Sequence, residues 1–170
     1  MTSITTDPLL LFNLATELLH DAEQALLDNN LYLPEHRFVS YNAPAWDCCD
    51  HLVAHVGPMR PAKMTKKTRV TAAKSSGNIN IAEADIFLTY IGCAAIGDPI
   101  PSDEVIQENA ENIYQPMWVL FQELMCNFTA SALESTFGKG CHVIDIIQLA
   151  PHPPMGGCES FVFQITVQFS

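Results

Sequence analysis

Four residues early in the chain carry side chains that could bind a metal ion. Cys48, Cys49, His51 and His55 combine thiolate sulfur with imidazole nitrogen, the ligands of tetrahedral zinc sites. Such sites usually join a closely spaced cysteine pair to a distant second pair, and no second pair of that spacing occurs here. In an extended segment the two cysteines would also point to opposite faces. The pattern therefore favours structural cysteines, and we expect no metal and no other cofactor.

The same cysteines, or Cys141, could act as the nucleophile of a thiol-dependent enzyme if a histidine lay beside them. A reactive thiolate needs electropositive, partly exposed surroundings and an orienting base. The acids that flank the cysteine pair would instead raise the pKa of the thiol. Hydrolase, P-loop and dinucleotide-binding signatures are also absent from the sequence. We expect no enzyme and no catalytic residue, and a small cytoplasmic thiol- or metal-dependent enzyme is the alternative from a different functional class.

Length and composition indicate a single domain over residues 1–170, which is enough chain to bury a core without metal or disulfides. No signal peptide is recognisable, and the longest apolar run is far shorter than a membrane span. We therefore expect no membrane contact. Six cysteines in a chain without an export signal indicate reduced thiols rather than a disulfide framework.

The net charge of −11 conceals a strong separation of charge along the chain. Six of the eight basic residues fall within fifteen positions that contain no acid, so the remainder of the chain carries a net −17. These residues are Arg60, Lys63, Lys66, Lys67, Arg69 and Lys74. The polar segment at about 60–80 lacks apolar periodicity, which predicts a long basic hairpin loop. An acidic body argues against general nucleic-acid binding, but it allows this loop to contact an acidic surface or phosphate.

Hydrophobic periodicity predicts the elements around these residues. The expected order is a helix from Pro8 to Asn29–Asn30, strands over 37–41, 52–56 and 81–91, a helix from Ser102 to about 128, and strands over 142–149 and 161–169. Pro116 lies inside the second helical pattern and predicts a kink or a break there. Neighbouring strands with short connections predict an α+β domain, in which two main helices pack on one face of an antiparallel or mixed sheet of about five strands.

Two short motifs resemble those of the tail-terminator (tail-completion) proteins of long-tailed bacteriophages, especially phages of actinobacteria. The first is Trp46, Asp47 and Cys48 leading into a strand that contains Leu52. The second is a glycine turn, Gly156 and Gly157, leading into a terminal strand that contains Val167. In this family both motifs are structural, and the cysteine packs beside the tryptophan.

The resemblance implies a virion protein that forms a homo-oligomeric ring, a hexamer by analogy, at the top of the tail. Its implied partners are the major tail tube protein and the head–tail connector or stopper protein, with passive contact of DNA in the channel. The implied location is the neck of the virion, and the host cytoplasm during assembly. Within virion assembly, the alternative is a head–tail adaptor or stopper ring. The basic loop is then a candidate for subunit or tube contacts, and a solvated loop without a partner is the simpler alternative.

Overall fold

The computed structural model describes residues 8–41, 50–61, 82–94, 102–126, 141–155 and 158–169, and all structural statements below concern these ranges. The helical elements are α1 (Pro8–Asp28), α3 (Asp103–Asn109), the π-helical turn η1 (Ala110–Tyr114) and α4 (Gln115–Cys126). The strands are β1 (His36–Ser40), β2 (His51–Pro61), β3 (Ala82–Cys93), β4 (Cys141–Met155) and β5 (Cys158–Phe169).

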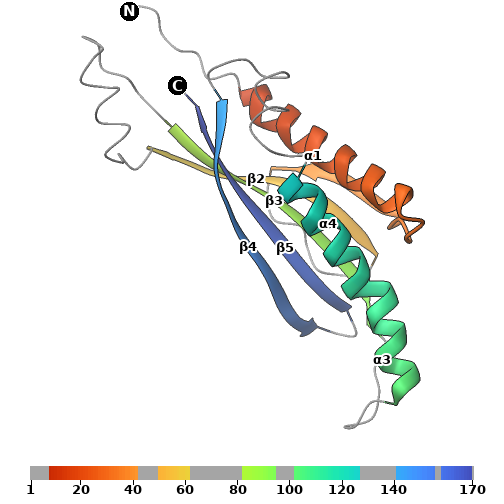
Figure 1. The fold of residues 1–170 in the computed structure, drawn as a ribbon. Helices are drawn as coiled ribbons and strands as arrows, with labels where there is room; N and C mark the ends of the chain where they lie inside the picture. The colour runs from red at the N-terminus through yellow and green to blue at the C-terminus, as the bar shows by residue number, and fades with distance from the viewer. Residues whose placement is uncertain are drawn as a thin grey trace, which may run out of the picture.

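The strands form one five-stranded mixed sheet in the order β1-β2-β3-β5-β4. The edge strand β1 runs parallel to β2, and the other neighbours pair antiparallel. Figure 1 shows α1 and α4 on the same side of this sheet, while α3 continues past the ends of the strands. The predicted α+β class is therefore confirmed, as is the hairpin pairing of the second and third strands.

The core lies between the helices and one face of the sheet, and side-chain alternation along each strand determines which residues reach it. In β5, Phe161, Phe163, Ile165 and Val167 are at most 1 % exposed, as their period-2 spacing predicts. In β3, Tyr90 stacks on Phe161 at 4.9 Å between ring centroids. The helices complete this core with their leucine stripes; α1 contributes Leu11, Leu14, Leu18 and Leu26, and α4 contributes Leu120 and Leu124.

The second helical region is interrupted, as the proline predicts, but the irregularity precedes the proline. The π turn η1 occupies Ala110–Tyr114, immediately before the segment that contains Pro116. Pro116 has no N–H to donate to the carbonyl of Asn112, the bond that a continuous α-helix would require. The hydroxyl of Tyr90 donates to this carbonyl instead, over 3.0 Å. A strand residue thus satisfies the acceptor that the proline leaves open, and it fixes the broken helix to the sheet.

Two details differ from the sequence expectation. Except for β1, the strands are longer than predicted; β2, for example, continues through Gly57 and Pro58 to Pro61 rather than ending before Gly57. Cys158 is disulfide-bonded, so the expectation of reduced thiols is wrong at this residue. Cys93 is a free, exposed thiol.

Replacing Ile165 by Asp should prevent folding. Ile165 is 0 % exposed in the interior strand β5, so the new carboxylate would lie among apolar side chains without a partner. We expect insoluble protein on expression. The control is Ile165→Val, which removes one methylene group and should cost only about 1 kcal/mol of unfolding free energy in chemical denaturation. A soluble Ile165→Asp variant with a native circular-dichroism spectrum would contradict this packing.

Candidate functional site

Most of the residues that the sequence singles out lie outside the described ranges. These are Trp46, Asp47, Cys48, Cys49, Lys63, Lys66, Lys67, Arg69, Lys74, Gly156 and Gly157. Of the motif residues that are described, Leu52 and Val167 are fully buried core residues of interior strands. Such burial is what a structural role requires.

The two histidines of the candidate zinc site lie on β2, on the sheet face opposite the helices, and both are packed against aromatic rings. The ring centroid of His51 lies 4.9 Å from that of His36 and 6.1 Å from that of Phe38. His55 stacks on Phe87 with centroids 4.7 Å apart, and burial lowers its pKa. Within the part of the chain that the structure describes, no group of three His, Cys, Asp or Glu side chains is placed to hold a metal ion.

Arg60 does not belong to the basic loop in which the sequence predicts it. It lies in β2 opposite Glu83 of β3, and its Nε is 3.3 Å from Glu83 Oε2. Its Nη2 donates to Asp85 Oδ1 over 2.9 Å, and its Nη1 pairs with Asp85 Oδ2. The hydroxyl of Thr166 on β5 donates to the same carboxylate over 2.7 Å. The guanidinium is thus engaged within its own chain and joins β2 to β3.

A β-bulge explains why Arg60 faces Asp85. The register of β2 against β3 shifts between Val56 and Met59, where β2 has one extra residue. One extra residue moves every following side chain to the opposite face of the sheet. Without the bulge, the side chain of Arg60 would lie on the same face of the sheet as that of Val56, towards the helices. Gly57 lies in the bulge because a Cβ atom there would come within 2.6 Å of the Phe87 ring.

The cluster of Arg60, Glu83, Asp85 and Thr166 is an ion-pair network on a largely buried strand surface. The side chains of Glu83 and Asp85 are 8 % exposed, against 38 % for Arg60. Burial by itself would raise the pKa of Asp85, but the hydrogen bonds from Arg60, Thr166 and Gln164 outweigh it and hold this pKa below its ordinary value. The carboxylate is therefore ionised at neutral pH, which suits a structural ion pair rather than proton transfer.

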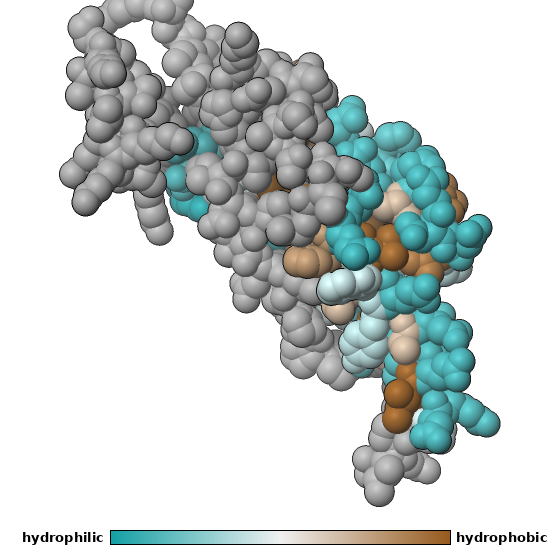
Figure 2. Space-filling view, in the orientation of Figure 1, coloured by the Kyte–Doolittle hydropathy of each residue, from teal (hydrophilic) through white to brown (hydrophobic). Residues whose placement is uncertain are grey.

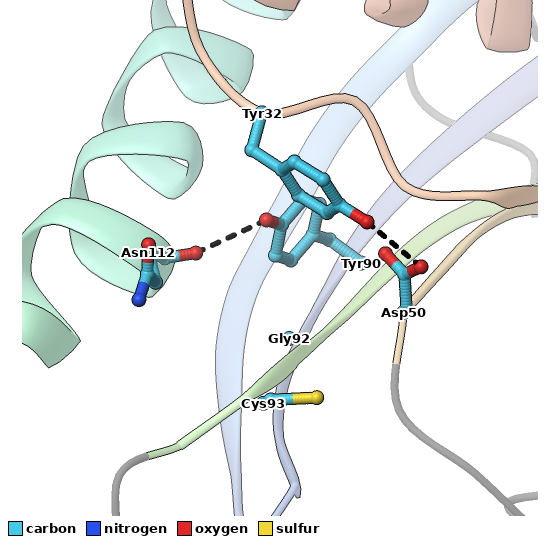
Figure 3. A pocket seen from close by; sticks show the side chains of 6 residues that line it. All are labelled: Tyr32, Asp50, Tyr90, Gly92, Cys93 and Asn112. Atoms are coloured by element: carbon cyan, nitrogen blue, oxygen red, sulfur yellow. Dashed lines mark hydrogen bonds between the residues drawn. The ribbon is translucent and has the colours of Figure 1, made fainter.

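A pocket of about 310 Å³ lies where β3 ends against η1. It is lined by Tyr32, Asp50, Tyr90, Gly92, Cys93 and Asn112, and Figure 3 shows their side chains around it. Asp50 precedes β2 in a left-handed conformation with a φ of 75°. One oxygen of its carboxylate, Oδ2, accepts from the hydroxyl of Tyr32 over 2.9 Å and from the N–H of Glu35 over 3.1 Å. The other, Oδ1, is buried without a hydrogen-bond partner among the described residues.

The pocket offers little acid–base chemistry near neutral pH. The hydrogen bond to Asp50 raises the pKa of Tyr32, and burial raises the pKa of Tyr90. Both hydroxyls also donate to groups of the same chain, as the dashed lines in Figure 3 show. The thiol of Cys93 has no histidine among the lining residues. The pocket thus lies at the contact between β3 and the broken helix, where Tyr90 donates its hydrogen bond to Asn112.

Sequence reasoning missed both the ion-pair network and the pocket. The alternation of β3 places Glu83 and Asp85 away from the core, which is the usual position of solvated acids. Their partners come from two other strands, and the pocket draws residues from four separate segments. The only local sign was an acid pair on a strand whose other face is apolar, and this sign did not identify Arg60 as the partner.

Replacing Asp85 by Asn should reduce the loss of folding stability that occurs as the pH falls from neutral into the acid range. The pKa of Asp85 in the folded state lies below its ordinary value of 3.8, so the carboxylate stabilises the fold above that pH. This contribution is lost as the pH falls through the folded-state pKa. Melting temperatures measured from pH 7 downward should show wild type above the variant at neutral pH, with the two converging in acid. Glu17→Gln, at an exposed position of α1, is the control and should show the same pH dependence of the melting temperature as wild type.

No helix in the described ranges is both long and apolar enough to cross a membrane. Compared with known proteins, the chain matches no family model and no curated protein.

Proposed function

We propose that the chain is a phage tail terminator, a ring-forming subunit that caps the finished tail tube. The observation that carries this proposal is the position of the two motif segments in the fold. The segment with Trp46, Asp47 and Cys48 directly precedes the interior strand β2, and Gly156–Gly157 connects β4 to the interior strand β5. Both motifs thus lead into interior strands of an α+β sheet, as the family resemblance implies.

The edge strands of the sheet support a role in assembly. β1 is an edge strand of five residues, and His36, Arg37 and Phe38 on it are exposed. An edge strand presents unpaired backbone N–H and C=O groups that a neighbouring chain can pair with. A ring needs two different surfaces on each copy, because each subunit must contact the next head to tail. The two edges of this sheet, β1 and β4, are different surfaces of this kind.

The mechanism in this proposal is geometric rather than catalytic. A closed ring of copies docks on the last ring of the tail tube, blocks further polymerisation and presents its other face to the head connector. Repetition of one modest contact around the ring gives high avidity without a large individual interface. The protein then belongs to the neck of the virion and acts with the tube protein and the connector or stopper protein.

Deleting the gene should give tails of uncontrolled length that fail to join filled heads. Without a cap, nothing ends the addition of tube rings. Electron microscopy of particles from cells infected with the deletion phage, with the gene supplied in trans as the control, measures the length distribution. Tails of normal length would contradict the terminator function. Normal tails that only fail to attach to heads would support the adaptor or stopper alternative.

Neutralising the basic segment should weaken assembly while leaving the subunit folded. The change is Lys63, Lys66, Lys67 and Arg69 to Gln; Arg60 is kept because it joins β2 to β3. Surface charges contribute little to folding, so the melting temperature should stay close to that of wild type. Binding to purified tail tubes should fall, and wild-type binding should weaken as salt shortens the screening length to below about 8 Å. Lys139→Gln is the control. Equal binding by mutant and wild type at every salt concentration would leave the segment without an assembly role.

A further inference from the structure

The helix that follows β3 projects from the body of the domain. None of the residues of α3 is buried, and its main packing partner is the adjacent turn η1. Figure 1 shows α3 running beyond the ends of the strands. The hydroxyl of Ser102 caps its first turn by accepting from the N–H of Val105, so the projecting end is a formed helix. We call residues 102–118 the arm; they comprise Ser102, α3, η1 and the first turn of α4.

One side of the arm carries large apolar side chains that are left uncovered. Ile106, Tyr114 and Trp118 are 54 %, 50 % and 55 % exposed. Together with Ala110 they recur every four residues, the spacing that places helix residues on one side. The Trp118 ring lies 6.0 Å from that of Phe121, so this side continues into α4. Exposed Trp and Tyr side chains of this kind are the residues that dominate protein–protein interfaces.

The arm is also strongly acidic. It contains Asp103, Glu104, Glu108 and Glu111, all exposed, and it contains no Lys or Arg. Figure 2 shows hydrophilic and hydrophobic residues side by side along the projecting end. The partner that fits this surface is therefore a basic segment with apolar or aliphatic content.

The chain itself supplies such a segment. Residues 62–80 hold five of the eight basic residues, Lys63, Lys66, Lys67, Arg69 and Lys74, without any acid. The aliphatic stems of lysines cover apolar and aromatic surface while their ammonium groups reach carboxylates, and an ammonium group over a Trp ring adds a cation–π contact. The opposite charges of the two segments also favour rapid association.

The basic segment of one copy cannot readily reach the arm of the same copy. The basic segment leaves β2 at Pro61 and returns at Ala82, which are opposite each other at one end of the β2–β3 pair. The arm follows the other end of β3, where Gly92 lies close to Ile113 and Asn112 of η1. The two ends of β2 are roughly 30 Å apart at about 3.3 Å per residue. No basic residue of the segment is more than eight residues from Pro61 or Ala82, and eight extended residues span at most about 29 Å.

The geometry points to a head-to-tail contact in which the arm of one copy receives the 62–80 segment of a second copy. The segment joins the sheet at the end opposite the start of the arm, so the contact is heterologous and repeats from copy to copy. Such repetition closes into a ring when the rotation permits. This inference deepens the proposed function by naming a subunit contact, and it requires that copies associate.

Paired charge reversals test the contact directly. The arm variant is Glu108→Lys with Glu111→Lys, and the segment variant is Lys66→Glu with Lys67→Glu. Each variant alone opposes like charges across the contact and should self-associate at least about tenfold more weakly than wild type, measured by sedimentation velocity. Mixed in equal amounts, the two variants restore opposite charges at every contact and should assemble as wild type does.

The matched control reverses two exposed acids on α1, Glu17→Lys with Asp28→Lys, which changes the net charge as much as the arm variant does. This control should associate as wild type does. A second comparison addresses the apolar side: Trp118→Ala should weaken association, whereas Leu27→Ala, at a residue of α1 that is 51 % exposed, should not. Melting temperatures near that of wild type establish that each variant is folded.

Two outcomes would overturn the inference. One is a mixture of the arm and segment variants that associates no better than either alone, and the other is wild type that stays monomeric up to about 1 mM, the limit of very weak binding. Rings that form without this complementation would leave the proposed function standing and remove only the arm contact. Conversely, complementation in a phage whose deletion tails have normal length would retain the contact and remove the terminator function.

Discussion

The central strand β3 is the element on which the rest of the structure depends, because both of its faces are buried and each face is held by a different kind of interaction. Towards the helices, Ala84, Ile86, Leu88 and Tyr90 join the apolar core. Away from them, Asp85 binds Arg60 of β2 and Thr166 of β5. A strand that is buried on both sides allows no slip of register, since a shift of one residue would place Asp85 in the core. The ion-pair network therefore fixes the register that the hydrophobic core requires.

The same strand also determines the shape of the opposite end of the molecule. Tyr90 is buried, and its hydroxyl donates to the carbonyl of Asn112. Pro116 has no N–H to donate to this carbonyl. The hydrogen bond from Tyr90 supplies a donor for the carbonyl at the point where the helix changes from π to α geometry. The consequence is a helix with two parts. The α4 part packs on the sheet, and the α3 part projects beyond it.

The distribution of charge gives the molecule two unlike ends. Arg37 and Arg60 are both engaged with acids of the same chain, at Glu23 and at Glu83 with Asp85. The strand-embedded arginine thus stabilises the sheet, while the lysines that follow it in the sequence lie in the segment that links β2 to β3. Meanwhile the helices α1, α3 and α4 carry acids and no Lys or Arg. A subunit whose basic segment leaves the sheet at one end and whose acidic, aromatic arm begins at the other end is suited to head-to-tail association.

The sequence by itself determined the helices, most of the strands and the core faces, because these depend on the local alternation or helical spacing of apolar residues. Phe161, Phe163, Ile165 and Val167 are an example, since their period-2 spacing alone identified the buried face of β5. The Ser102 cap and the irregularity near Pro116 were also predictable, because each follows from the chemistry of single residues. The tertiary structure decided what depends on contacts between distant segments. Only the bulge at Gly57, where the ring of Phe87 leaves no room for a side chain, directs Arg60 of β2 towards Asp85. Likewise, the pocket beside Asp50 and the projection of α3 arise where separate segments meet, and no local pattern specifies which segments those are.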